Sequence, residues 1–219
     1  MALPIMKHPT FELTVPSTKS TLKYRPFLVK EEKILLLAQG SNQTKDLISA
    51  VKQIVSNCVI EGDIDVDKAP TFDLEYIFLK LRANSVSDIA KFTLTEEGGE
   101  QSKIEIDLNQ VEIQHTENHS NIVDLGNGVH LEMRYPTYTT LSNLKNTNAV
   151  DVTFEMIEKC IDKVIQGEEV MELKDFSKAD VKEFLDSLTS QNFRDVEYKV
   201  GKEKKSRTFT GLADFFQSA

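Results

Sequence analysis

The stretch RPFLVKEEKILLLAQG, residues 25–40, decides the fold because secondary structure changes type within it. Before it, apolar residues alternate with polar ones from residue 11 to 15, the letters PSTKS indicate a turn, and Leu22 and Tyr24 resume the alternation. This period of two is typical of a β-hairpin. Pro26 then ends the second strand, so the chain begins as β structure.

Helical patterns follow the hairpin. Glu31 and Glu32 place negative charge in a first helical turn, and Gly40 supplies a stop, which predicts a helix from about residue 30 to 40. The apolar residues of 44–58 recur at the spacing of one buried stripe and predict a second helix. Pro70 and Thr71 open a third helix, which we expect to end near residues 82–85.

The centre of the chain reads as antiparallel strands. Residues 90–94 and 104–108 alternate on either side of EEGGE, and residues 123–125 and 129–133 do so around GNG, where glycine tolerates positive φ. We predict a β-meander. A helical stripe follows, formed by Phe154, Ile157, Cys160, Ile161 and Val164 and ending at Gly167.

The remaining residues predict one more helix, over about 177–188, and a final hairpin. The fold class is therefore α+β. We expect three regions: an N-terminal hairpin with helices (1–87), the antiparallel meander (88–136), and a helical C-terminal part with a short terminal hairpin (137–219), packed as one or two domains. No internal repeat, low-complexity tract or flexible linker is evident.

Composition excludes several classes of function. A net charge of -9 and a pI near 5.0 oppose broad contact with nucleic acid, and the basic cluster at 202–207 is too local to reverse this. No run approaches the ~18 apolar residues of a membrane span, and the N-terminus lacks signal-peptide character. We expect a soluble protein of a reducing cytoplasm, with no membrane contact.

Candidate metal sites are weak. His115 and His119 have the four-residue spacing of helical zinc ligands, but their surroundings predict a strand and a loop, so we favour a solvated loop and keep a metal-dependent hydrolase as a distant alternative. Asp63, Asp65 and Asp67 resemble the start of a calcium loop, yet position 12 is Leu74 where glutamate is needed. We predict a solvated acidic loop.

The sequence contains no motif that indicates an enzyme. Cys58 and Cys160 lie on apolar helix faces and are expected to be buried, inert thiols. Phosphate-binding loops and nucleophile elbows are absent. We predict no catalytic residues and no cofactor.

Three segments combine apolar anchors with charges: residues 25–40, the helix LEYIFLKLRANSVSD and the terminal GLADFF. Each suits either a structural core with a solvated rim or a surface that docks a partner. The letters ILLLA are too apolar on all sides for a surface helix, so burial by the protein's own sheet or by a neighbouring subunit is expected.

Together, and in this order, FELTVPSTKSTLKYRPFLVKEEKILLLA, LEYIFLKLRANSVSD and GLADFF resemble the small baseplate hub protein family of T-even-type contractile-tailed bacteriophages. The resemblance runs from about residue 4 to the end. It implies a role in building the baseplate hub through contacts with other hub or tail proteins, with homo-oligomers possible, and not catalysis. An assembly chaperone absent from the finished virion is the alternative. The implied locations are the host cytoplasm during assembly and the virion tail baseplate.

The resemblance also selects candidate partner-binding residues. They lie at the hairpin-to-helix junction, on the third helix and in the C-terminal tail: Tyr24, Arg25, Pro26, Phe27, Glu31, Glu32, Arg82, Leu212, Asp214, Phe215 and Phe216. In the tail, Leu212, Phe215 and Phe216 have helical spacing and form one apolar face. We predict that this face docks into a partner or a second copy.

Overall fold

The computed structural model of the chain describes residues 6–95, 101–113, 120–145 and 149–173, together with Asp180 and Phe184. These residues divide into two compact units, the first holding the described residues up to 113 and the second those from 120. The boundary therefore falls inside the predicted central region. Each unit combines helices with antiparallel strands, which confirms the α+β class.

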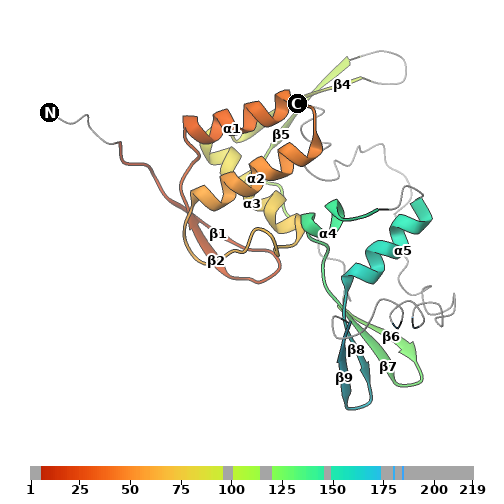
Figure 1. The fold of residues 1–219 in the computed structure, drawn as a ribbon. Coiled ribbons are helices and arrows are strands. Elements are labelled where there is room, and N and C mark those ends of the chain that lie inside the picture. The colour runs from red at the N-terminus through yellow and green to blue at the C-terminus, as the bar shows by residue number, and fades with distance from the viewer. Residues whose placement is uncertain are drawn as a thin grey trace. The chain divides into compact units, whose positions relative to one another are not determined.

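The first unit packs three helices with two small sheets (Figure 1). Its elements in chain order are β1 (Phe11–Thr14), β2 (Thr21–Tyr24), α1 (Val29–Gly40), α2 (Thr44–Cys58), β3 (Val59–Glu61), α3 (Thr71–Ser85), β4 (Ile89–Thr95) and β5 (Gln101–Asp107). The predicted hairpin and three helices are confirmed. Strand β3, which the sequence did not predict, returns from α2 and pairs antiparallel with β2, so that the sheet order is β1-β2-β3.

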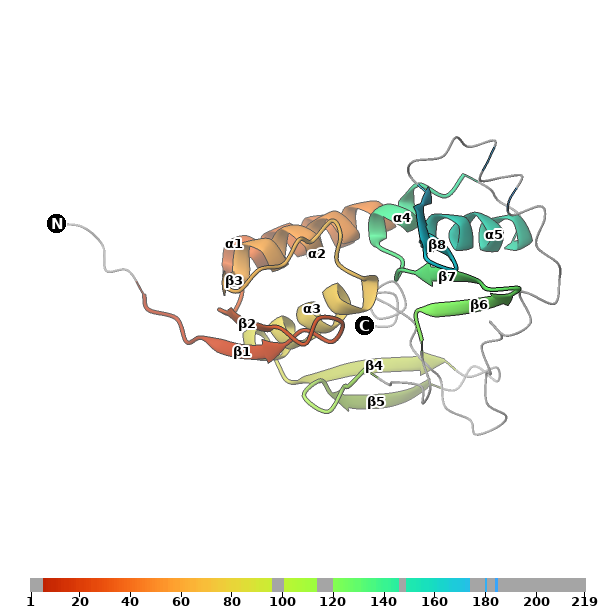
Figure 2. The same ribbon diagram turned by 90° about the horizontal axis from the view of Figure 1, so that it is seen from below.

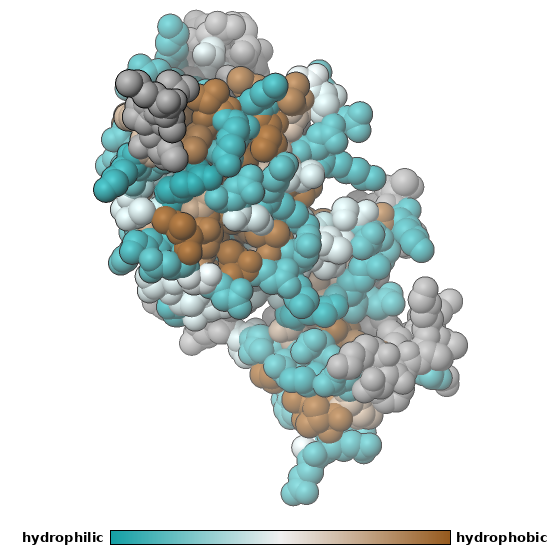
Figure 3. Space-filling view, turned by 60° about the vertical axis from the view of Figure 1, so that its left-hand side comes forward, coloured by the Kyte–Doolittle hydropathy of each residue, from teal (hydrophilic) through white to brown (hydrophobic). Residues whose placement is uncertain are grey.

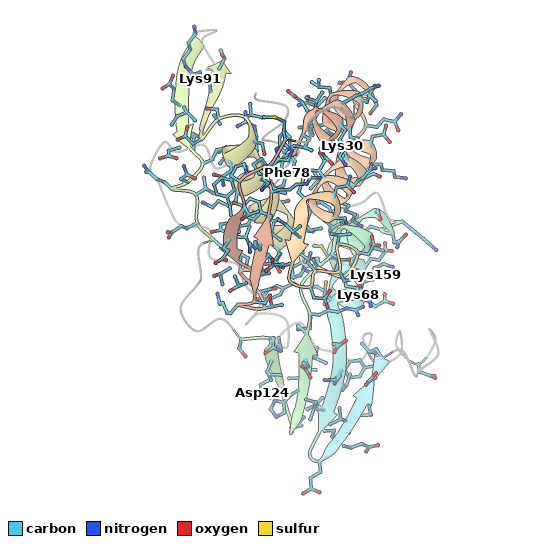
Figure 4. The ribbon with its side chains drawn as sticks, turned by 90° about the vertical axis from the view of Figure 1, so that its left-hand side faces the viewer. Lys30, Lys68, Phe78, Lys91, Asp124 and Lys159 are labelled. Carbon is cyan, nitrogen blue, oxygen red and sulfur yellow. The ribbon has the colours of Figure 1, made fainter. Side chains whose placement is uncertain are left out.

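The core of the first unit lies between the helices and the β1–β2 hairpin. Figure 2 shows α3 beneath α1 and α2, and Figure 4 shows Phe78 at the centre of the packed side chains. The apolar side chains with no exposed surface come from β2, α2 and α3 and are Leu22, Val51, Ile54, Val55, Cys58, Leu74, Ile77, Phe78 and Leu81. Because α2 and α3 contribute them at helical spacing, each helix turns one stripe inward.

The second unit is built on a four-stranded antiparallel sheet. Its elements are β6 (Ile122–Gly126), β7 (Val129–Met133), α4 (Tyr138–Ser142), α5 (Ala149–Cys160), β8 (Ile161–Gln166) and β9 (Glu169–Glu172), with sheet order β6-β7-β8-β9. Leu131, Ile161 and Val164 form its buried core, against which Ile157 and Phe184 pack. The predicted turn between β6 and β7 has positive φ at Gly126, Asn127 and Gly128 (81°, 54° and 76°).

Two predictions need correction. The two central hairpins belong to separate sheets, β4–β5 and β6–β7, so they do not form one continuous meander. The helix expected to run to Gly167 ends at Cys160 and continues as β8. Ile161 and Val164 are three residues apart and both buried, as in a helix, because the strand register shifts by one residue between them.

The C-terminal predictions lie mostly outside the described residues. Asp180 and Phe184 are helical, in keeping with a helix over about 177–188. The terminal hairpin falls on residues that the structure does not describe.

A matched pair of leucines tests the placement of the core. Leu81 is fully buried, whereas 66% of Leu37 is exposed. We expect Leu81→Ala to lower the free energy of unfolding by about 2 to 5 kcal/mol, because it leaves a cavity. Leu37→Ala should change it by less than about 0.5 kcal/mol. Urea titration of both variants decides the matter, and equal losses would contradict the assignment of inner and outer faces.

Candidate partner-binding surface

Arg25 joins the hairpin to the helices of the first unit. Its guanidinium donates a hydrogen bond from Nη2 to the Asn57 carbonyl at 3.0 Å and another from Nη1 to the Pro26 carbonyl at 2.9 Å. Its backbone N–H donates to the Cys58 carbonyl at 3.0 Å. The last carbonyls of a helix have no partner within the helix. Arg25 therefore fixes the end of α2 beside the strand that precedes α1.

Glu31 completes this network from the first turn of α1. Its side chain is fully buried, and Oε1 lies 3.1 Å from Arg25 Nη2 and 3.4 Å from Lys30 Nζ. Oε2 accepts the Leu28 backbone N–H at 2.9 Å, which caps the helix. Burial raises the pKa of Glu31, but the hydrogen bonds from Arg25 and Leu28 outweigh it and hold the pKa below its ordinary value. The buried carboxylate is thus charged and paired.

The rest of the junction is anchored on α3. Asn84 Nδ2 donates to the Tyr24 hydroxyl at 2.8 Å, and the Phe27 backbone N–H donates to Ser85 Oγ at 2.9 Å. Tyr24 and Phe27 are themselves buried. The entry to α1 is therefore held from both its sheet side and its helix side.

The outer face of α1, defined by Val29, Leu36 and Leu37, is exposed. These side chains are 81%, 61% and 66% exposed, whereas Leu35 and Ala38 on the opposite face are buried. Residues i, i+7 and i+8 lie close together on one side of a helix. Figure 3 shows hydrophobic side chains exposed among hydrophilic ones on the first unit. A fixed helix therefore presents an apolar surface.

The predicted site residues divide by exposure. Tyr24, Phe27 and Glu31 are buried, Arg25, Pro26 and Arg82 are partly buried, and Glu32 is exposed. Burial lowers the pKa of Arg82. The buried residues support the junction, and a contribution of any of them to partner binding stays a prediction. The tail residues Leu212, Asp214, Phe215 and Phe216 lie outside the described residues.

Sequence reasoning missed which apolar residues are exposed. The excess of apolar residues in ILLLA was the signal that could have indicated an exposed apolar face, but from it we expected the helix to be buried on most sides. Within the described chain this expectation is wrong for Leu36 and Leu37, because α1 packs against α2 and buries only the face that carries Leu35 and Ala38. Burial by a neighbouring subunit stays open.

The other candidate sites are explained by local contacts. Asp65 accepts the backbone N–H groups of Asp67 and Lys68 and pairs with the Lys68 ammonium at 3.2 Å, so the acidic loop is solvated and stabilised by its own turn. Cys58 and Cys160 are buried as predicted, and burial raises the pKa of Cys58 to about 11. Within the described residues, no three His, Cys, Asp or Glu side chains are placed to hold a metal. His115 and His119 fall outside them.

Comparison with known proteins gives one match. A family model described as T4 bacteriophage base plate protein matches residues 8–217. No curated protein and no solved structure matches the chain. Among the described helices, none is both long and apolar enough to cross a membrane.

The Glu31 network predicts a pH dependence. Because the folded-state pKa of Glu31 is lowered, its contribution to stability is present above the ordinary glutamate value of about 4.3 and is lost as the pH falls through the folded-state pKa. We expect Glu31→Gln to cost about 1.5 to 3 kcal/mol at pH 7. Urea unfolding of both proteins from pH 7 down to pH 3 measures this. The difference between them should shrink on acidification, and a difference that grows would refute the assignment.

Proposed function

The chain belongs to the T4 bacteriophage base plate protein family, and from this we propose that it is a non-enzymatic component of the baseplate hub that docks to a neighbouring baseplate protein through the outer face of α1. The family gives it a structural role in the baseplate. The observation that carries the docking proposal is the exposure of Val29, Leu36 and Leu37 on one face of an anchored helix.

The energetics favour docking by this face. Burying one such side chain stabilises a complex by about 1.5 to 3 kcal/mol relative to leaving it in water. Interface cores are apolar with a charged rim, and Lys30, Glu32 and Lys33 supply such a rim here. Because Glu31 and Arg25 already fix the helix, association costs little further ordering of its backbone.

The competing role is that of an assembly chaperone, present in the host cytoplasm and absent from the finished particle. The two roles differ in one observable. A hub component is found in purified tails by mass spectrometry at a fixed ratio to the other baseplate proteins, and a chaperone is found only in infected-cell lysate.

A double substitution tests the docking face. We expect Leu36→Glu with Leu37→Glu to abolish incorporation of the protein into tails while its unfolding midpoint in urea stays near that of the wild type, because both side chains are already in water. Val170→Glu is the matched control, since Val170 is also an exposed apolar residue (57%) but lies on β9 of the second unit. Wild-type incorporation of the double variant would refute docking by α1.

The terminal segment GLADFF is a second proposed contact, with Leu212, Phe215 and Phe216 as its anchors. Deletion of residues 211–219 should prevent incorporation into tails and leave thermal unfolding unchanged. A large fall in the unfolding temperature would instead assign the segment to the core of the protein.

A further inference from the structure

The two units share an order of elements that the sequence does not reveal. Each has a β-hairpin, then two helices, then a strand that returns antiparallel to the second strand of the hairpin. In the first unit these are β1, β2, α1, α2 and β3. In the second they are β6, β7, α4, α5 and β8.

An arginine occupies the same place in both units, directly after the second hairpin strand. The backbone N–H of Arg25 donates to the carbonyl of Cys58 at 3.0 Å, and that of Arg134 donates to the carbonyl of Cys160 at 2.7 Å. Each cysteine is buried, is the last residue of its helix, and is followed at once by the return strand.

The guanidinium groups of the two arginines also make equivalent hydrogen bonds. Arg25 Nη2 donates to the carbonyl of Asn57 at 3.0 Å, and Arg134 Nη2 donates to that of Lys159 at 2.9 Å. Asn57 and Lys159 each immediately precede the terminal cysteine. Both arginines therefore satisfy carbonyls that the helix end leaves without a partner.

The return strands carry the same irregularity. The register shifts by one residue at the second residue of each strand, Ile60 in β3 and Asp162 in β8, at the point where the partner strand is about to end. A β-bulge is a specific feature that ordinary strand pairing does not require. Its position relative to the arginine is identical in the two units.

A cross-strand ion pair follows each bulge. Lys23 Nζ lies 3.2 Å from Glu61 Oε1, and Lys163 Nζ lies 2.9 Å from Glu132 Oε2. In the first unit the hairpin strand carries the lysine and the return strand the glutamate, and in the second unit the hairpin strand carries the glutamate and the return strand the lysine. The position is thus kept while the residues differ.

We infer that the chain is a tandem duplication of one module, and that Arg25 and Arg134 are equivalent positioning residues that clamp the end of the second helix, where the return strand begins, to the end of the second hairpin strand. The backbone bond of each arginine continues the pairing of the two strands, but the guanidinium bond, the bulge and the ion pair are further features that the order of elements does not require. Features found in one module only are then specialisations. The first module has a 12-residue α1 where the second has the five-residue α4, and the second has β9.

Amide hydrogen exchange of the full-length chain, read by mass spectrometry, tests the equivalence. Loss of charge-assisted hydrogen bonds should speed exchange about tenfold or more at residues 59–61 in Arg25→Ala and at 161–166 in Arg134→Ala. Lys91→Ala removes the exposed pair with Glu105 on the β4–β5 hairpin and should leave both segments unchanged. Arg25→Lys and Arg134→Lys keep a donor and should show smaller effects in the same segments. They replace the alanine variants if those do not fold.

Faster exchange of each return strand on loss of its own arginine supports the duplicated clamp. The duplicated clamp is overturned if only one of the two alanine variants speeds exchange in its own return strand, for example if β8 in Arg134→Ala exchanges as in the wild type. The experiment needs no partner protein, and its failure would leave unchanged the exposure of Val29, Leu36 and Leu37, which is the observation that carries the proposed docking by α1.

Discussion

The buried pair of Arg25 and Glu31 is the interaction on which the first unit depends. A charge without water is costly unless it is paired and fully hydrogen-bonded. Glu31 meets this condition through Arg25, Lys30 and the Leu28 N–H, and the guanidinium of Arg25 meets it through Glu31 and the carbonyls of Pro26 and Asn57, the latter at the end of α2. Since these donors and acceptors come from the end of β2, the start of α1 and the end of α2, the pair sets the geometry of all three.

This constraint explains how α1 keeps an apolar outer face. In a helix held only by hydrophobic contact, the apolar residues would be expected to turn inward. Here the carboxylate of Glu31 fixes which side faces the core, and Leu35 and Ala38 follow on that side. Leu36 and Leu37 are then directed outward by the helical period. This outward leucine pair is the surface that we propose a neighbouring baseplate protein buries.

In the second unit an arginine also bonds the end of the second helix, but its ionic partner differs. Arg134 caps the end of α5 as Arg25 caps α2, but its ionic partner is Asp162, whose carboxylate lies 3.8 Å away and is half exposed. Sequence comparison within the chain does not expose the relation, because the helical segments differ in length and the charges of the cross-strand pair are reversed. Backbone hydrogen bonds and the bulge preserve it, since they depend on geometry more than on side-chain identity.

The sequence by itself determined the α+β class, the β1–β2 hairpin, the helices of the first unit and the glycine-rich turn between β6 and β7, because period, proline and glycine act over short range. It also indicated the family. Tertiary structure decided what short-range patterns cannot encode. Ile161 and Val164 fit a helix or a bulged strand equally well until β7 supplies a partner. Likewise, apolar letters alone cannot tell Leu35 from Leu36, because the choice of inner face was made by a buried ion pair between residues six apart.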